Sequence, residues 1–84
     1  MSIAKLIARA TDNNEHNDAA ILLAVHINDN ESLVRLAEIK DEHYKANSLR
    51  NDLYLERYEL LKLLLEKAKN ILSEDEYNEI HNAF

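Results

Sequence analysis

The sequence contains neither glycine nor proline in its 84 residues, and this restricts the fold more than any other feature. Tight turns between strands depend on these two residues, because glycine adopts positive φ angles without steric cost and proline presets the turn geometry. Asparagine also tolerates such turns, and the chain has ten asparagines. We therefore expect an all-α fold in which turns rich in asparagine and aspartate connect the helices.

Length and composition favour a single helical domain over residues 1–84. The absence of cysteine excludes disulfides and thiolate metal sites. No segment reaches the ~18 consecutive apolar residues of a membrane span, and the N-terminal segment lacks the apolar core of a secretory signal. We expect a cytoplasmic protein that does not contact membranes.

The N-terminal third of the chain predicts a short helical hairpin. Ser2 is a good N-cap, and apolar residues follow it with helical spacing as far as Ala10. The turn at residues 12–14 separates this helix from a second one that starts near Asn17. Residues 19–27 are apolar almost all round, which is typical of a buried helix at the centre of a fold.

The pattern after Asn30 predicts one long helix, bent or straight, over about residues 31–72. Steps of four and three residues from Leu33 to Leu72 meet apolar or aromatic side chains at nine of twelve positions, as in a coiled coil. The exceptions are Lys40, Asn47 and Asn51. A break near Asn47–Asn51 is the alternative, because the polar residues there are poor helix formers.

A short C-terminal helix follows, and its start is marked by a capping box. Ser73 and Glu76 have the spacing in which the serine hydroxyl caps the helix and the glutamate reaches back. Leu72 and Tyr77 stand at the positions of a hydrophobic staple. We expect this helix to fold back onto the long helix and complete a helical bundle.

The apolar arc of residues 53–72 covers about half of the helix circumference, more than the ~100° that one packing face requires. A rod of about 60 Å would also outreach its short neighbours. We therefore predict a homo-oligomer, with a dimer favoured; the alternative is a compact monomeric four-helix bundle. The interface candidates are Tyr54, Arg57, Tyr58, Leu61 and Leu65.

No residue pattern predicts a catalytic, metal or cofactor site. The four histidines do not fall three or four residues apart, so they form no helical metal-binding pair. His26, in the most apolar segment, is expected in the core, and the other histidines are expected at the surface. The serines fall at helix starts, where they act as caps.

Two carboxylate pairs, Glu38 with Asp41 and Glu56 with Glu59, each lie one turn apart on a helix. Such pairs on neighbouring helices can hold Mg²⁺ for phosphate chemistry. They resemble, in reversed order, the paired acids of all-helical nucleotide pyrophosphohydrolases of the MazG type. That resemblance implies a Mg-dependent enzyme. The simpler interpretation is a solvated face on which acids pair with neighbouring bases.

The charge distribution bears on the partner. The net charge is −6; residues 11–34 carry five acids and no lysine or arginine, and residues 70–84 carry four acids. This opposes direct binding to nucleic acid, which requires a basic face. We predict a small acidic interaction module (an adaptor, inhibitor or regulator of another protein, possibly a basic one) and not an enzyme. A DNA-mimic inhibitor, with the acids of 12–31 and 74–79 on one surface, is a further alternative.

Overall fold

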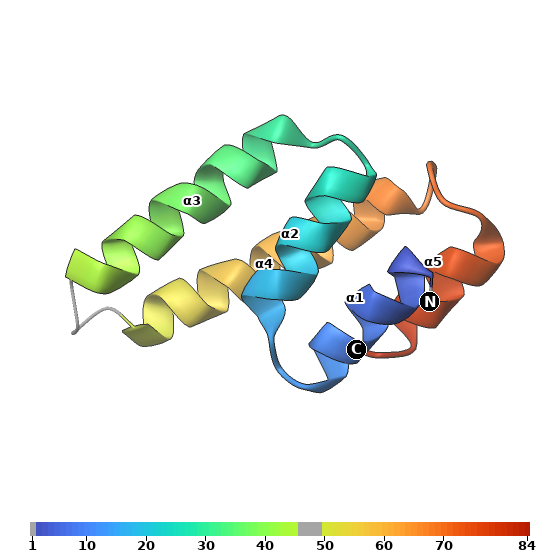
Figure 1. Cartoon of the computed structure of the whole chain (residues 1–84), viewed down its shortest axis with the longest axis horizontal. Helices are drawn as coiled ribbons and strands as arrows, with labels where there is room; N and C mark the ends of the chain where they lie inside the picture. The colour runs from blue at the N-terminus through green and yellow to red at the C-terminus, as the bar shows by residue number, and fades with distance from the viewer. Residues whose placement is uncertain (1, 46–49) are drawn as a thin grey trace.

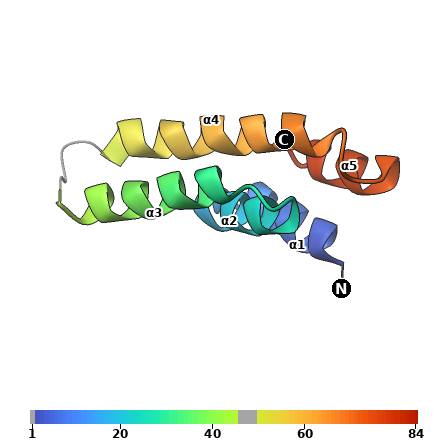
Figure 2. The same ribbon diagram turned by 90° about the horizontal axis from the view of Figure 1, so that it is seen from above.

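The computed structural model describes residues 2–45 and 50–84, which form five α-helices (Figure 1). These are α1 (Ile3–Asp12), α2 (His16–His26), α3 (Asn30–Lys45), α4 (Arg50–Ala68) and α5 (Glu74–His81). Figure 2 shows two layers, with α4 and α5 in one layer and α1, α2 and α3 in the other. The predicted all-α bundle is confirmed.

The single long helix predicted over residues 31–72 is wrong. α3 and α4 are separate helices that lie side by side and run in opposite directions (Figures 1 and 2). The heptad pattern did not distinguish one continuous helix from two antiparallel helices, because each helix of a hairpin repeats its own apolar face with the same period. The alternative, a break near Asn47–Asn51, falls partly in residues 46–49, outside the described residues, and Asn51 lies in α4. The longest dimension of the molecule is 39 Å, well short of a 60 Å rod.

Asparagine provides the left-handed backbone that glycine usually supplies, as the composition predicts. Asn14, after α1, has a φ angle of 60°, and Asn28, after α2, has a φ angle of 59°. Asparagine accepts this conformation more readily than other residues with a Cβ atom. These two positions turn the chain between the first three helices.

Two of the four predicted serine caps, Ser2 and Ser73, are confirmed. Ser32 lies inside α3 and is not a cap, because its own amide donates to Asp29, and Ser48 lies outside the described residues. The Ser2 hydroxyl accepts a hydrogen bond of 3.2 Å from a backbone amide in the first turn of α1. The Ser73 hydroxyl accepts one of 3.3 Å from the amide of Glu76 and donates one of 3.2 Å to the carboxylate of Glu76. Leu72 and Tyr77, the residues of the predicted staple, are partly buried and pack against the core.

Helix α2 lies at the centre of the bundle and contacts α1, α3 and α4. Its buried face is formed mainly by alanines, whose small side chains allow neighbouring helices to approach closely. Ile21 and Val25 lie on its other face and are exposed, so α2 is buried on one side and not all round. Among the side chains whose burial the structure describes, the largest fully buried ones are Ile7, Leu23, Leu36, Ile39, Leu61, Leu64 and Ile80.

Within residues 2–45 and 50–84, no helix has both the length and the apolar character needed to cross a bilayer.

Candidate functional site

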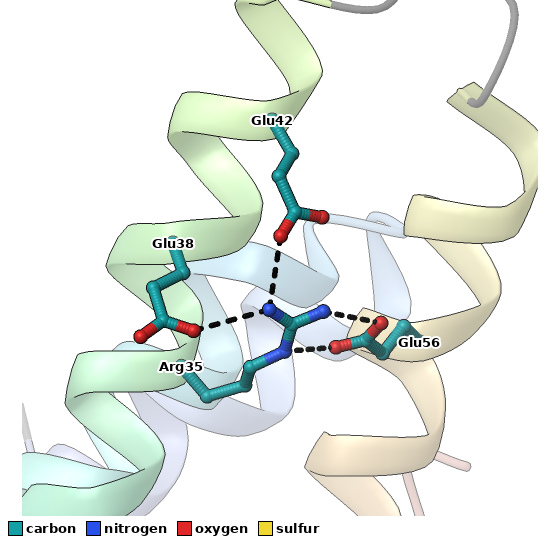
Figure 3. Close-up of polar contacts among 4 residues, drawn as sticks. All are labelled: Arg35, Glu38, Glu42 and Glu56. Atoms are coloured by element: carbon teal, nitrogen blue, oxygen red, sulfur yellow. Dashed lines mark hydrogen bonds and ion pairs between the residues drawn. The ribbon is translucent and has the colours of Figure 1, made fainter.

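Arg35 connects the two helices of the hairpin formed by α3 and α4 (Figure 3). Its Nε and Nη2 atoms donate to the two carboxylate oxygens of Glu56 on α4, with a distance of 2.7 Å for Nη2. Its Nη1 atom donates to Glu38 at 3.2 Å and to Glu42 at 3.1 Å, both on α3. One guanidinium therefore joins the two helices and neutralises part of an acidic cluster.

Arg35 contacts one member of each of the two predicted carboxylate pairs. Glu38 and Glu56, one member of each pair, lie close together as expected, but the cation between them is the guanidinium of Arg35. Hydrogen bonds from Arg35 hold the pKa of Glu56 below its usual value. The carboxylates of Glu56, Glu42 and Glu38 in turn raise the pKa of Arg35. The arginine contacts both carboxylate oxygens of Glu56 and one of Glu38. Among the described residues no three acidic or imidazole side chains are grouped to hold a metal ion.

A second ion pair closes the other end of the hairpin. Lys67 Nζ, near the end of α4, lies 2.8 Å from Asp29 Oδ2, just before α3. The other carboxylate oxygen of Asp29 accepts a hydrogen bond of 3.1 Å from the amide of Ser32, so Asp29 caps α3. The hydrogen bond from Lys67 is the main cause that lowers the pKa of Asp29.

An aromatic pocket lies beside the N-terminus of α2. The His16 ring centroid is 5.1 Å from that of Tyr54 and 5.0 Å from that of Tyr58, and Tyr58 lies 6.1 Å from Phe84. The rings border a cavity of about 360 Å³. We call it the aromatic pocket, and its lining residues are Thr11, Asn14, His16, Tyr54, Leu55, Tyr58, Ala83 and Phe84.

The structure exchanges the expected positions of two histidines. His16, expected at the surface, is only 6% exposed, and its burial lowers its pKa. His26, expected in the core, is exposed, and its Nε2 atom lies 3.6 Å from a carboxylate oxygen of Glu76. The apolar run of α2 gave no sign of which side faces the core, because apolar side chains occupy both sides.

A groove of about 400 Å³ runs between α1 and α2. Its apolar wall includes the exposed side chains of Leu6 and Ile21, and Val25 is exposed one turn further along α2. We call this the α1–α2 groove, and its lining residues are Leu6, Arg9, Ala10, Asn13, Glu15, Asp18, Ile21 and Leu22. The sequence did not indicate this groove, because it depends on how the two short helices pack.

The five predicted interface residues fall into two groups. Leu61 and Leu65 are buried in the chain's own core, so a partner cannot reach them in the folded protein. Tyr54 is 43% exposed, and Tyr58 and Arg57 are half-buried. The Nε atom of Arg57 is buried and has no hydrogen-bond partner in the part of the chain that the structure describes.

No protein-family model, no curated protein sequence and no solved structure matches this chain. Function must therefore be inferred from the surfaces and pockets described above.

Proposed function

We propose that the protein is a small helical interaction module that binds another protein and regulates or adapts it. The observation that carries this proposal is the α1–α2 groove with its exposed apolar wall. Contiguous exposed apolar residues at the edge of a groove are typical of protein-binding surfaces. A groove between two helices suits an amphipathic helix of a partner, whose apolar side chains would occupy it.

The charges around the groove support a partner with basic residues. Glu15 and Asp18 line the groove, and Arg9 is the single cation among the described residues that line it. Both acids belong to the segment 11–34, which has no lysine or arginine. Complementary charges at the rim of an interface increase the association rate and help to set the orientation of the partner.

Affinity capture with matched variants tests this function. The full-length protein, Ile21→Asp and the control Val34→Asp would each be used to capture proteins from a lysate of the source cells. Both substitutions place a charge at an exposed position, but only Ile21 lines the α1–α2 groove. We expect a protein that is retained by the wild type and by Val34→Asp and is lost with Ile21→Asp.

Titration calorimetry with that purified protein would then measure direct binding, and Asp18→Lys should weaken it. If every captured protein bound Ile21→Asp as well as it bound the wild type, the groove would have no role in recognition.

We further propose that the module self-associates through α4 and the segment after it. Support comes from three large apolar side chains that are exposed there: Leu55, Leu63 and Ile71. Sedimentation equilibrium should give the mass of a dimer for the wild type and of a monomer for Leu63→Asp. A monomeric wild type at millimolar concentration would contradict self-association and would leave the binding of a different partner untouched.

A further inference from the structure

We propose that the aromatic pocket binds one neutral, planar aromatic group that carries an N–H donor, and that this group is a tryptophan side chain of the partner protein. The identity of the source rests on the proposed interaction function, whereas the pocket itself is a separate site from the α1–α2 groove.

The size and walls of the pocket fit a group of one or two fused rings. Its volume of about 360 Å³ lies near the lower end of the ~300–1,000 Å³ found for small-molecule sites. The His16 ring is tilted by 49° to Tyr54 and by 55° to Tyr58, and Tyr58 is tilted by 55° to Phe84. Rings inclined in this way offer both faces and edges to an inserted aromatic group.

The charge of the pocket favours a neutral group. Among the described residues that line it, none is a carboxylate, lysine or arginine. The burial of His16 favours its uncharged form. The ammonium group of Lys62 already lies 5.6 Å from the centroid of the Tyr58 ring. An organic cation would therefore lose its hydration without gaining an acidic partner, and it would meet a like charge nearby.

The imidazole of His16 supplies the polar group that the ligand would satisfy. Its Nδ1 atom is buried and has no hydrogen-bond partner among the described residues. The hydroxyl of Thr11, also in the pocket wall, already donates to the carbonyl of Ile7 at 2.9 Å. A neutral imidazole has one bare nitrogen, which accepts an N–H donor.

A tryptophan side chain combines the required features. Its indole has two fused rings and a single N–H donor, and tryptophan is among the residues most enriched at the energetic centres of protein interfaces. Leu55 and Tyr54 both line the pocket, and both are exposed. These two side chains provide an apolar rim on which the polypeptide around the tryptophan can rest.

The test uses the full-length chain, which contains no tryptophan of its own, so indole fluorescence reports only the ligand. Four probes would be titrated, with amide NMR shifts as the second readout: N-acetyltryptophanamide, indole, 1-methylindole and tetramethylammonium. We expect the first two to bind with dissociation constants of about 1 mM or lower, as suits fragments of this size. 1-Methylindole, which lacks the N–H, should bind several-fold more weakly, and tetramethylammonium should not bind.

Variants connect binding to the pocket. His16→Phe keeps an aromatic ring and removes the nitrogen, so the affinity for indole should fall to that for 1-methylindole. Tyr54→Leu, at a partly exposed wall position, should weaken all three aromatic probes and serves as the second variant if His16→Phe does not fold. Val34→Ala, on the exposed side of α3, should change nothing.

Several outcomes would overturn the proposal. Equal affinity of N-acetyltryptophanamide for the wild type and both pocket variants would show that it does not bind in the aromatic pocket. Binding of indole without N-acetyltryptophanamide would assign the pocket to a free small molecule, and binding of tetramethylammonium would reject the neutral class. A partner captured through Ile21 in the absence of any indole binding would overturn this inference alone and leave the proposed function standing.

Discussion

At the scale of single residues, Arg35 forms ion pairs with three carboxylates. It binds one carboxylate on the opposite helix through two hydrogen bonds and two carboxylates on its own helix through single ones. A planar guanidinium suits this arrangement, because it presents five donors in a fixed geometry. Replacing it would leave three acids close together with no cation among them.

We expect Arg35→Gln to lower the free energy of unfolding by about 1 kcal/mol at low salt. The estimate is modest because the side chain is about one-third exposed, so solvent screens its ion pairs. The loss should shrink at high salt, where the repulsion among the acids is screened as well. Urea denaturation at both salt concentrations would measure it, with Lys40→Gln, an exposed residue of the same helix, as the control. A loss no greater than that of the control would show that the cluster contributes nothing.

His16 should make the stability of the protein depend on pH. Burial lowers the pKa of His16 in the folded state below its ordinary value of 6.5. The unfolded chain therefore binds the proton more readily. The stability is complete above pH 6.5 and declines as the pH falls from there toward the lower pKa of the folded state.

Replacement by phenylalanine tests this dependence. In His16→Phe, the free energy of unfolding should change less between about pH 7 and pH 5 than in the wild type. Val34→Ala, a change at an exposed residue that does not titrate, should keep the slope of the wild type. An equal slope in His16→Phe and the wild type would mean that another group titrates in this range.

At the scale of helices, α5 depends on a cap that is local in sequence. The Ser73 hydroxyl satisfies one of the amides at the start of α5, and the Glu76 carboxylate accepts a hydrogen bond from that hydroxyl. Ser73→Ala should lower the free energy of unfolding by ~1 kcal/mol, as is usual for a lost N-cap. Ser73→Asp should retain most of the stability, because aspartate also caps helices. Identical melting curves for Ser73→Ala and the wild type would argue against this cap.

The hairpin of α3 and α4 can be tested by a distance measurement. The chain has no cysteine, so Val34→Cys and Leu63→Cys introduce two unique sites for spin labels at exposed positions of α3 and α4. A continuous helix would separate these residues by about 44 Å, at 1.5 Å per residue. The antiparallel hairpin predicts a much shorter distance. Labelled protein diluted with unlabelled protein would exclude distances between chains, and a separation near 44 Å would contradict the fold.

At the scale of the whole molecule, the hairpin changes the argument for assembly. The chain exposes 5452 Å², close to the ~5,100 Å² expected for a compact monomer of its mass. The molecule therefore has no long rod that a second chain would need to cover. The proposal of self-association now depends on the apolar side chains that remain exposed, such as Leu63.

Leu61 and Leu63 offer a matched test of core against surface on one helix. Leu61 is fully buried, whereas Leu63 is 47% exposed. Leu61→Asp should abolish the folded state, because it buries an unpaired charge, and Leu61→Ala should cost about 2–5 kcal/mol. Leu63→Asp should keep the helical circular dichroism and the melting temperature near those of the wild type. A folded Leu61→Asp variant would show that Leu61 does not belong to the core.

The sequence by itself determined the features that depend on neighbouring residues. The lack of glycine and proline made the protein all-helical, asparagine took the left-handed positions, and the serine caps could be identified three residues from the amides that they bind. These interactions are local, so their residue types and spacing are visible in the chain itself.

Only the tertiary structure decided which distant residues meet. The heptad pattern continued across the change of direction between α3 and α4, so it could not reveal that Glu56 faces Arg35 or that Leu61 is covered by the chain itself. In the same way, His16 and Phe84 border one pocket only because the helices that lie between them in the sequence fold back on one another. A periodic pattern specifies which face of a helix is apolar, and the packing of the helices specifies what covers that face.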